Sequence, residues 1–194
     1  MSVRDVAMAA LLTQRKPDVD VRLEETYRFA GVKSFGGGVF PSVVKSGSDF
    51  SYRQLIRVNV DEFVYPKLMA WEGALGVVPP ACDGMVVSPE FCVFTVNRAE
   101  VRPAFLDIYF RQPHVWPELA GASAGTNMRR RRIYPENFLK FVIRLPSLGE
   151  QDHVIGVDRR AREAREAHAA LLLEIDALVP SVLREICGLD QADR

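Results

Sequence analysis

The sequence predicts an α+β fold, in which a mixed-sheet globular domain is followed by a long C-terminal coiled-coil helix. Short segments that alternate apolar and polar residues fill residues 19–96, and Gly, Pro and Asp turns separate them, which is typical of short strands. A helical repeat without turn signals then extends from residue 147 towards the C-terminus. Hydrophobic residues make up 48% of the chain, which is enough for a globular core.

The first 60 residues are expected to contain one helix and four strands. An apparent capping box at residues 2–5 precedes apolar residues on one helical face, and Pro17 would end that helix. The strands are predicted at residues 19–23, 26–32, 39–44 and 53–60, and Gly36, Gly37 and Gly38 form a tight turn with positive φ between the second and the third. The helical face consists of Val3, Val6, Ala10 and Leu11.

Further strands are expected at residues 74–78, 85–88, 91–96 and 141–145. Pro103 favours the start of a helix over residues 103–111, a second helix follows His114, and residues 135–140 form a helical turn. Residues 123–126 are predicted to be a loop. In the long C-terminal helix, Pro180 is expected to cause a break or a kink near Val179, and Gly188 to end the last turn.

An apolar seam runs along this C-terminal helix with spacings that alternate between three and four residues. Such a 3.5-residue repeat is typical of a left-handed coiled coil, and charged residues occupy the remaining faces. The other interpretation is an amphipathic helix packed on its own domain, but the length of the seam favours a partner helix. The seam consists of Val154, Val157, Ala161, Ala164, His168, Leu171, Ile175, Leu178 and Val182.

Charge is balanced over the whole chain but not along it. Residues 1–149 carry 19 Lys or Arg and 15 Asp or Glu, whereas residues 150–194 carry 6 and 10, so the globular part is basic. No stretch approaches the roughly 18 apolar residues of a membrane span, and no secretory signal is recognisable. Three scattered cysteines, Cys82, Cys92 and Cys187, indicate reduced and mostly buried thiols in a cytoplasmic protein.

Four consecutive arginines at positions 129–132 are the sharpest local feature. Their guanidinium groups repel one another and require water or anions, so the alternatives are a solvated loop and a nucleic-acid contact. Neighbouring polar residues and further cations on or beside predicted loops favour the second. The predicted DNA contacts are Arg28, Lys33, Ser34, Lys45, Arg53, Lys67, Asn127, Arg129, Arg130, Arg131, Arg132 and Tyr134.

The sequence lacks the constellations that catalysis would require. The glycines at 36–38 are not followed by Gly-Lys-Ser/Thr, so they do not form a nucleotide-binding P-loop. Residues 88–91 resemble an amino-methyltransferase motif, but Glu90 replaces its second proline. Pro17-Asp18 has no Glu-x-Lys partner for a nuclease metal site, and the three histidines are too far apart in the sequence to predict a zinc site. We therefore expect no catalytic residues and no cofactor.

Several segments, in order, resemble the DNA-specificity (S) subunit of type I restriction–modification systems, in a half-length form with one target-recognition domain and one spacer helix. The most specific is Leu145-Pro146-Ser147-Leu148-Gly149-Glu150-Gln151, which resembles the start of the family's spacer helix. The resemblance implies a recognition domain over residues 1–146 and a dimerising spacer helix over 147–188. The segments are 27–40, 65–68, 76–79, 84–91, 123–126 and 144–151.

The resemblance further implies a non-catalytic subunit that reads one half of a split double-stranded DNA site. Its expected partners are an adenine-methyltransferase (M) subunit, in some systems a nuclease/translocase (R) subunit, and a second half, either identical in an antiparallel homodimer or different. The other hypothesis is a coiled-coil interaction protein whose basic run binds RNA or acidic proteins. A neighbouring adenine-methyltransferase gene would discriminate between the two.

Overall fold

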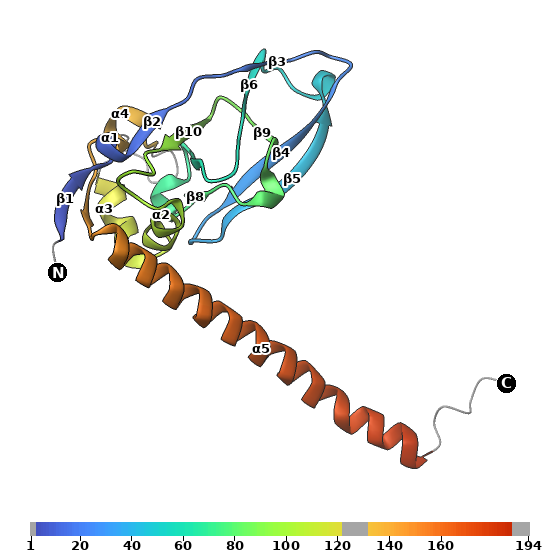
Figure 1. Cartoon of the computed structure of the whole chain (residues 1–194). Helices are drawn as coiled ribbons and strands as arrows, with labels where there is room; N and C mark the ends of the chain where they lie inside the picture. Colours follow the sequence, from blue (N-terminus) through green and yellow to red (C-terminus); the bar gives the residue numbers. More distant parts are fainter. Residues whose placement is uncertain (1–2, 122–131, 188–194) are drawn as a thin grey trace. The chain divides into compact units, whose positions relative to one another are not determined.

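The computed structural model describes residues 3–121 and 132–187, and the chain divides into two units between His153 and Val154. Unit 1 combines strands in several sheets, one of them mixed, with short helices (Figure 1). Helix α5 (Leu148–Cys187) begins in unit 1 and continues as unit 2. The expected α+β class with a long C-terminal helix is confirmed.

Unit 1 contains three sheets within the described residues. The five-stranded sheet has the order β3 (Val19–Asp20), β6 (Gln54–Arg57), β9 (Val86–Val87), β4 (Thr26–Lys33) and β5 (Gly38–Ser46). Its β4–β9 pair is parallel and its other pairs are antiparallel, so the sheet is mixed. The four-stranded sheet has the order β2 (Leu12–Gln14), β10 (Phe91–Val96), β7 (Phe63–Pro66) and β8 (Gly76–Val77), and β1 (Arg4–Ala7) pairs with β11 (Val142–Leu145).

An aromatic core fixes the four-stranded sheet. Phe138 of α4 (Pro135–Phe138) stacks on Phe63 with ring centroids 5.6 Å apart and lies 4.8 Å from Tyr65. Phe94 and Phe110, the latter from α2 (Pro103–Phe110), complete a cluster whose members are all fully buried. Aromatic pairs of this kind add about 0.5–1.5 kcal/mol each beyond the burial of their area, so β7 and β10 form a rigid base for the loop that precedes β10.

The predicted helices over residues 103–111 and after His114 are present as α2 and α3 (Trp116–Gly121), and the predicted turn over 135–140 is α4. The strands expected at 26–32, 39–44, 91–96 and 141–145 are confirmed. Those expected at 19–23, 53–60, 74–78 and 85–88 are present but shorter. Single helical turns complete unit 1: α1 (Met8–Leu11), η1 (Gly47–Asp49), η2 (Ala70–Glu72), η3 (Pro80–Cys82) and η4 (Pro113–Val115).

The predicted N-terminal helix is wrong. Residues 4–7 form strand β1, whose register pairs Val6 with Ile143, and only Met8–Leu11 are helical before the chain continues as β2. The helical spacing of Val6, Ala10 and Leu11 is therefore outweighed by backbone hydrogen bonds to β11 and β10, which supply partners from distant parts of the chain. Strand β7 was not predicted, although it lies at the centre of the aromatic core.

Pro180 does not break α5, which continues from Leu148 to Cys187 with the proline inside it. A proline inside a helix removes one backbone donor, and in this helix of 40 residues that loss does not end the helix. Gly188, the predicted end, and the predicted loop at 123–126 lie outside the described residues. No helix within the described residues is long and apolar enough to cross a membrane.

Candidate nucleic-acid interface

The β4–β5 hairpin places two of the predicted DNA contacts on one face. Lys45 lies opposite Tyr27 and Lys33 opposite Gly38, and alternate residues of β4 point to the same side, so both lysines share the face of Phe29. The Lys33 ammonium lies 4.9 Å from the centre of the Phe40 ring. This face is therefore both aromatic and basic.

Arg28 lies on the opposite face of β4. Burial raises the pKa of the Cys82 thiol, and the nearby Arg28 charge lowers it in part. Ser34, another predicted contact, is the first residue of the turn between the two strands. The backbone there has positive φ at Phe35 (58°), Gly36 (69°) and Gly38 (72°). The expected positive-φ turn is confirmed, and glycine suits it because side chains are strained in this region.

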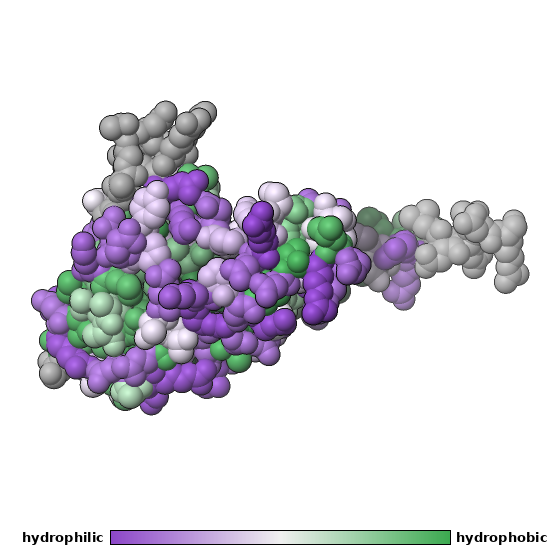
Figure 2. Space-filling view, turned by 90° about the horizontal axis from the view of Figure 1, so that it is seen from above, coloured by the Kyte–Doolittle hydropathy of each residue, from purple (hydrophilic) through white to green (hydrophobic). Residues whose placement is uncertain are grey.

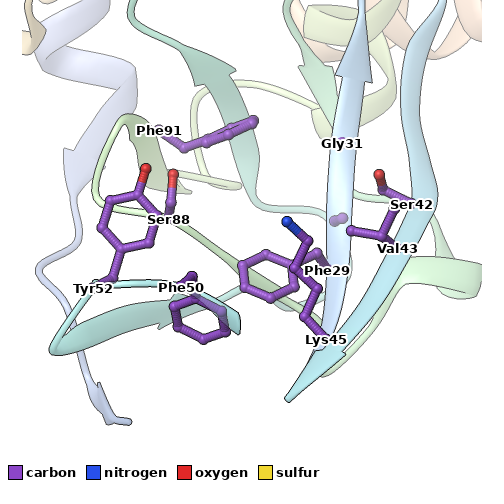
Figure 3. Close-up of a pocket in the computed structure, with 10 residues that line it drawn as sticks. Phe29, Gly31, Ser42, Val43, Lys45, Phe50, Tyr52, Ser88 and Phe91 are labelled. Atoms are coloured by element: carbon purple, nitrogen blue, oxygen red, sulfur yellow. The ribbon is translucent and has the colours of Figure 1, made fainter. Parts of the chain in front are cut away.

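A pocket of about 260 Å³ opens on the aromatic face of the hairpin (Figure 3). Its rings include Phe29 and Phe50, which meet edge to face at 5.4 Å, and Tyr52, whose ring lies 6.1 Å from that of Phe50. Its polar groups belong to Ser42, Lys45, Tyr52 and Ser88. The complete lining is Phe29, Ala30, Gly31, Ser42, Val43, Lys45, Phe50, Tyr52, Ser88 and Phe91.

Two more predicted cations hold the loop that forms one wall of this pocket. Between the lining residues Ser88 and Phe91, the Pro89 carbonyl accepts a hydrogen bond from Lys67 Nζ at 2.7 Å. Glu90 pairs with Arg132, with 2.6 Å between Oε2 and Nη1. The Arg132 and Glu90 side chains remain 40% and 47% exposed, so a competing phosphate can reach the arginine.

The remaining predicted contacts are dispersed or lie outside the description. Arg53 is exposed between Tyr52 and β6, and Tyr134 is exposed at the start of α4. Asn127, Arg129, Arg130 and Arg131 lie outside the described residues. The structure thus brings Lys33, Lys45, Lys67 and Arg132 to the hairpin face and to the loop beside its pocket.

Sequence reasoning missed the aromatic part of this pocket. Phe50 and Tyr52 come from one segment before β6 and Phe91 from the start of β10, and nothing in their spacing indicates that these two segments meet. The only local signal was the 88–91 segment, whose resemblance to a methyltransferase motif drew attention to a different chemistry. Within the described residues, no three His, Cys, Asp or Glu side chains lie together in a metal-binding group.

The first turn of α5 is bound tightly into unit 1. Ser147 Oγ and its backbone N–H both donate to the Glu150 carboxylate at 2.8 and 3.0 Å, and these bonds lower the pKa of Glu150. Gln151 is fully buried. Its amide oxygen accepts from the Arg102 backbone N–H at 2.8 Å, and its amide nitrogen donates to the carbonyls of Pro146 at 2.9 Å and Glu100 at 3.3 Å.

Along the rest of α5, large apolar side chains of the predicted seam are solvent-exposed in this chain, for example Leu171 by 52% and Ile175 by 48%. A second column beside the seam is also apolar and exposed, at Leu172, Val179 and Ile186. In the first half of the helix the equivalent positions hold Asp158 and Arg165. The apolar stripe therefore widens towards the C-terminal end, as in helices that contact more than one neighbour.

In the space-filling view, hydrophilic residues cover most of the visible surface and hydrophobic residues form smaller patches between them (Figure 2). Scattered apolar residues of this kind are normal on a protein surface. An apolar column that repeats along a helix is a different observation, because its regular spacing matches a partner helix.

No family model and no curated protein matches the sequence. Among solved structures, the chain is similar to the HsdS subunit from Thermoanaerobacter tengcongensis, with a TM-score of 0.63, 19% identity, and coverage of 94% of this chain and 49% of that one. It is also similar to a chain described under complex assembly and conformational transition of the type I R-M system (TM-score 0.61, 19% identity, coverage 95% and 49%).

A third similar structure is the type I restriction-modification S subunit from M. genitalium, with a TM-score of 0.57, 12% identity, and coverage of 99% of this chain and 47% of that one. The chain therefore spans about half the length of the solved chains that it matches. At these identities the likeness concerns the fold. This chain has the fold of one half of a type I specificity subunit.

Proposed function

We propose that this chain is a half-length specificity subunit of a type I-like restriction–modification complex. Residues 1–146 would recognise one half of a split double-stranded DNA site, and residues 147–188 would hold two such domains apart. The observation that carries the proposal is the match of 94–99% of the chain to about half of each solved subunit. Three features of the structure agree with this proposal. They are the hairpin face with Lys33 and Lys45, the loop at Pro89 and Glu90 that Lys67 and Arg132 bind, and the exposed apolar side chains of α5.

For assembly, we propose that two copies pair through α5 in antiparallel order. Pairing would bury the Leu171, Ile175 and Leu178 side chains, which are about half exposed in the single chain. Each would stabilise the dimer by roughly half of the ~1.5–3 kcal/mol that full burial of such a side chain contributes. Antiparallel order puts one recognition domain at each end, whereas parallel order would put both at the same end. A second, different half-subunit in place of the identical copy would pair in the same way.

The adenine-methyltransferase subunit is the proposed enzyme of the complex, and a nuclease/translocase subunit is a further partner. The exposed column at Leu172, Val179 and Ile186 supports an additional helical partner, because a two-helix seam leaves that column uncovered. The chain itself would contribute recognition and spacing, while base flipping and methyl transfer belong to the methyltransferase. S-adenosylmethionine turnover by the purified chain alone would contradict the assignment of methyl transfer to the methyltransferase subunit.

The test is DNA binding by the chain with and without its methyltransferase subunit, measured by fluorescence anisotropy over a range of salt concentrations. Lys45→Gln should weaken binding and lower the log–log salt slope by about 0.9 if the lysine neutralises one phosphate. Lys140→Gln makes the same charge change at an exposed position outside the hairpin face, and should leave the slope unchanged. Tight binding to RNA with no preference for duplex DNA would instead favour a coiled-coil interaction protein.

A further inference from the structure

The aromatic pocket on the hairpin is built as a ligand site. The pocket between Phe29, Phe50 and Phe91 is a mostly apolar concavity with a few polar groups in its lining, which is the usual composition of a small-molecule site. Tyr52 is 40% exposed at its rim, although aromatic residues gain most from burial. The ring contacts of Phe50 with Phe29 and Tyr27 hold the pocket in shape.

The polar groups of the pocket define the charge of its ligand. Figure 3 shows the Lys45 amine beside the Phe29 ring, and the hydroxyl groups of Tyr52 and Ser88 next to each other elsewhere in the lining. Among the described residues that line the pocket, none is acidic, so the lysine charge is not neutralised within the lining. A suitable ligand combines a flat ring system, an anionic group and hydrogen-bonding edges.

We propose that this pocket binds a single unpaired nucleobase of the DNA, with aromatic side chains against the base and Lys45 on an adjacent phosphate. Its volume of about 260 Å³ lies just below the roughly 300–1,000 Å³ of sites for drug-sized ligands, so one base fits and a base pair does not. The Ser42, Ser88 and Tyr52 hydroxyls can contact the edge of the base.

This inference rests on the proposed function, because it requires the hairpin face to lie against DNA. Turning a base out of a duplex costs a few kcal/mol and costs least at a mismatch. Base–aromatic stacking returns about 1–3 kcal/mol, so the pocket should discriminate between paired and mismatched duplexes. Its role would be to sense a weakened base pair within the recognised half-site.

The experiment measures two quantities on the full chain. Backbone chemical shifts are followed by NMR while dAMP, dCMP, dGMP and dTMP are added separately, and anisotropy compares a perfect 25-base-pair duplex with one that carries a central mismatch. Shifts are expected at Gly31, Tyr52 and Ser88. The chain should bind the mismatched duplex more tightly than the perfect one. Tyr52→Ala should weaken binding of the mismatched duplex by roughly 5- to 150-fold.

Matched controls separate the pocket from general effects. Phe35→Ala removes an exposed ring outside the pocket lining, and Lys140→Gln removes an exposed charge outside it, so neither should change the preference for the mismatch. Lys45→Gln keeps the aromatic walls and should weaken nucleotide binding. It therefore tests the pocket even if Tyr52→Ala lowers the thermal midpoint.

The outcomes of the two proposals are distinguishable. If duplex binding is intact but no mononucleotide shifts the pocket resonances and the mismatch has no effect, the base site is wrong and the DNA function stands. If the methyltransferase subunit shifts these resonances and nucleotides do not, the pocket is a protein contact and the base site is also wrong. If neither duplex binds, the proposed function itself fails.

Discussion

At the scale of single residues, Tyr65 and Cys92 are cross-strand partners in the core, on β7 and β10. Burial raises the pKa of the Cys92 thiol from 9.0 to about 11, against a partly opposing hydrogen bond with Tyr65, and burial raises the pKa of Tyr65 well above its ordinary value. At a pH near 9.0 to 10.0, the thiol and the phenol therefore begin to lose their protons in the unfolded chain but keep them in the folded chain.

This predicts that the free energy of unfolding decreases as the pH rises above about 9. The unfolded state then binds fewer protons than the folded state, and each such group contributes a slope of up to about −1.4 kcal/mol per pH unit. Stability is fully present below the unfolded pKa and is lost between 9.0 and about 11 for Cys92. Urea denaturation at pH 8, 9 and 10 measures the slope.

Cys92→Ala should make the slope shallower, while Cys187→Ala, at an exposed thiol, should leave it unchanged. The comparison concerns slopes, because loss of a buried side chain lowers stability at every pH. Equal slopes in the wild type and Cys92→Ala would contradict the assignment.

Gln151 provides a second test at this scale. Gln151→Ala removes three hydrogen bonds from a fully buried position and leaves their backbone partners without them, which should lower the free energy of unfolding by about 1–3 kcal/mol. Gln112→Ala, at an exposed glutamine, should change it by less than about 0.5 kcal/mol. Calorimetry of both variants checks the difference, and equal losses would show that Gln151 has no special role at the start of α5.

At the scale of elements, the apolar seam of α5 predicts self-association. Leu171→Asp with Ile175→Asp should produce monomers with a folded unit 1, because a buried pair of carboxylates has no counter-charge in the seam. Leu173→Asp makes the same change at a residue that is 72% exposed and lies off the seam, so this variant should stay dimeric. Analytical ultracentrifugation at micromolar concentrations measures both, and a monomeric wild type would contradict pairing of identical copies.

The elements with strong local signals were predictable from the sequence. The hairpin around Gly36, the helix after Pro103 and the long helix after Ser147 each carry a turn glycine, a helix-starting proline or a sustained repeat. Strand β1 and strand β7 could not be predicted in this way, because their hydrogen bonds join segments that lie far apart in the sequence.

In the candidate site, too, residues with a local sequence signal could be predicted, and residues brought together only by tertiary contacts could not. Charge identifies Lys33, Lys45 and Arg132, since an unpaired cation needs water or an anion wherever it lies. Burial and partners are tertiary properties, so the sequence could not show that Lys67 donates to Pro89 or that Tyr52 and Phe91 meet at one pocket. The second apolar column of α5 repeats every seven residues, at Leu172, Val179 and Ile186, so the sequence pattern alone is sufficient to find it.

At the scale of the whole molecule, the length of α5 in the proposed dimer sets the distance between the two DNA half-sites. Insertion of one seven-residue repeat after Ala164 keeps the seam in register and lengthens the helix by about 10 Å. At 3.4 Å per base pair, the spacer between the half-sites should lengthen by about three base pairs, while the bases read in each half stay the same. An insertion of two residues rotates the following seam residues by about 200°, to the opposite side of the helix, and should abolish assembly. An unchanged spacer in the seven-residue variant would show that α5 does not set the distance.

The central claim is that one chain reads one half of a split site, and a map of methylated adenines tests it most directly. The chain and its methyltransferase subunit would be expressed in a host without this modification, and the genome sequenced for modified adenines. An interrupted palindrome is expected, in which two identical half-sites in opposite orientation flank a spacer of fixed length. Methylation at a contiguous site, or methylation that does not depend on this chain, would contradict it.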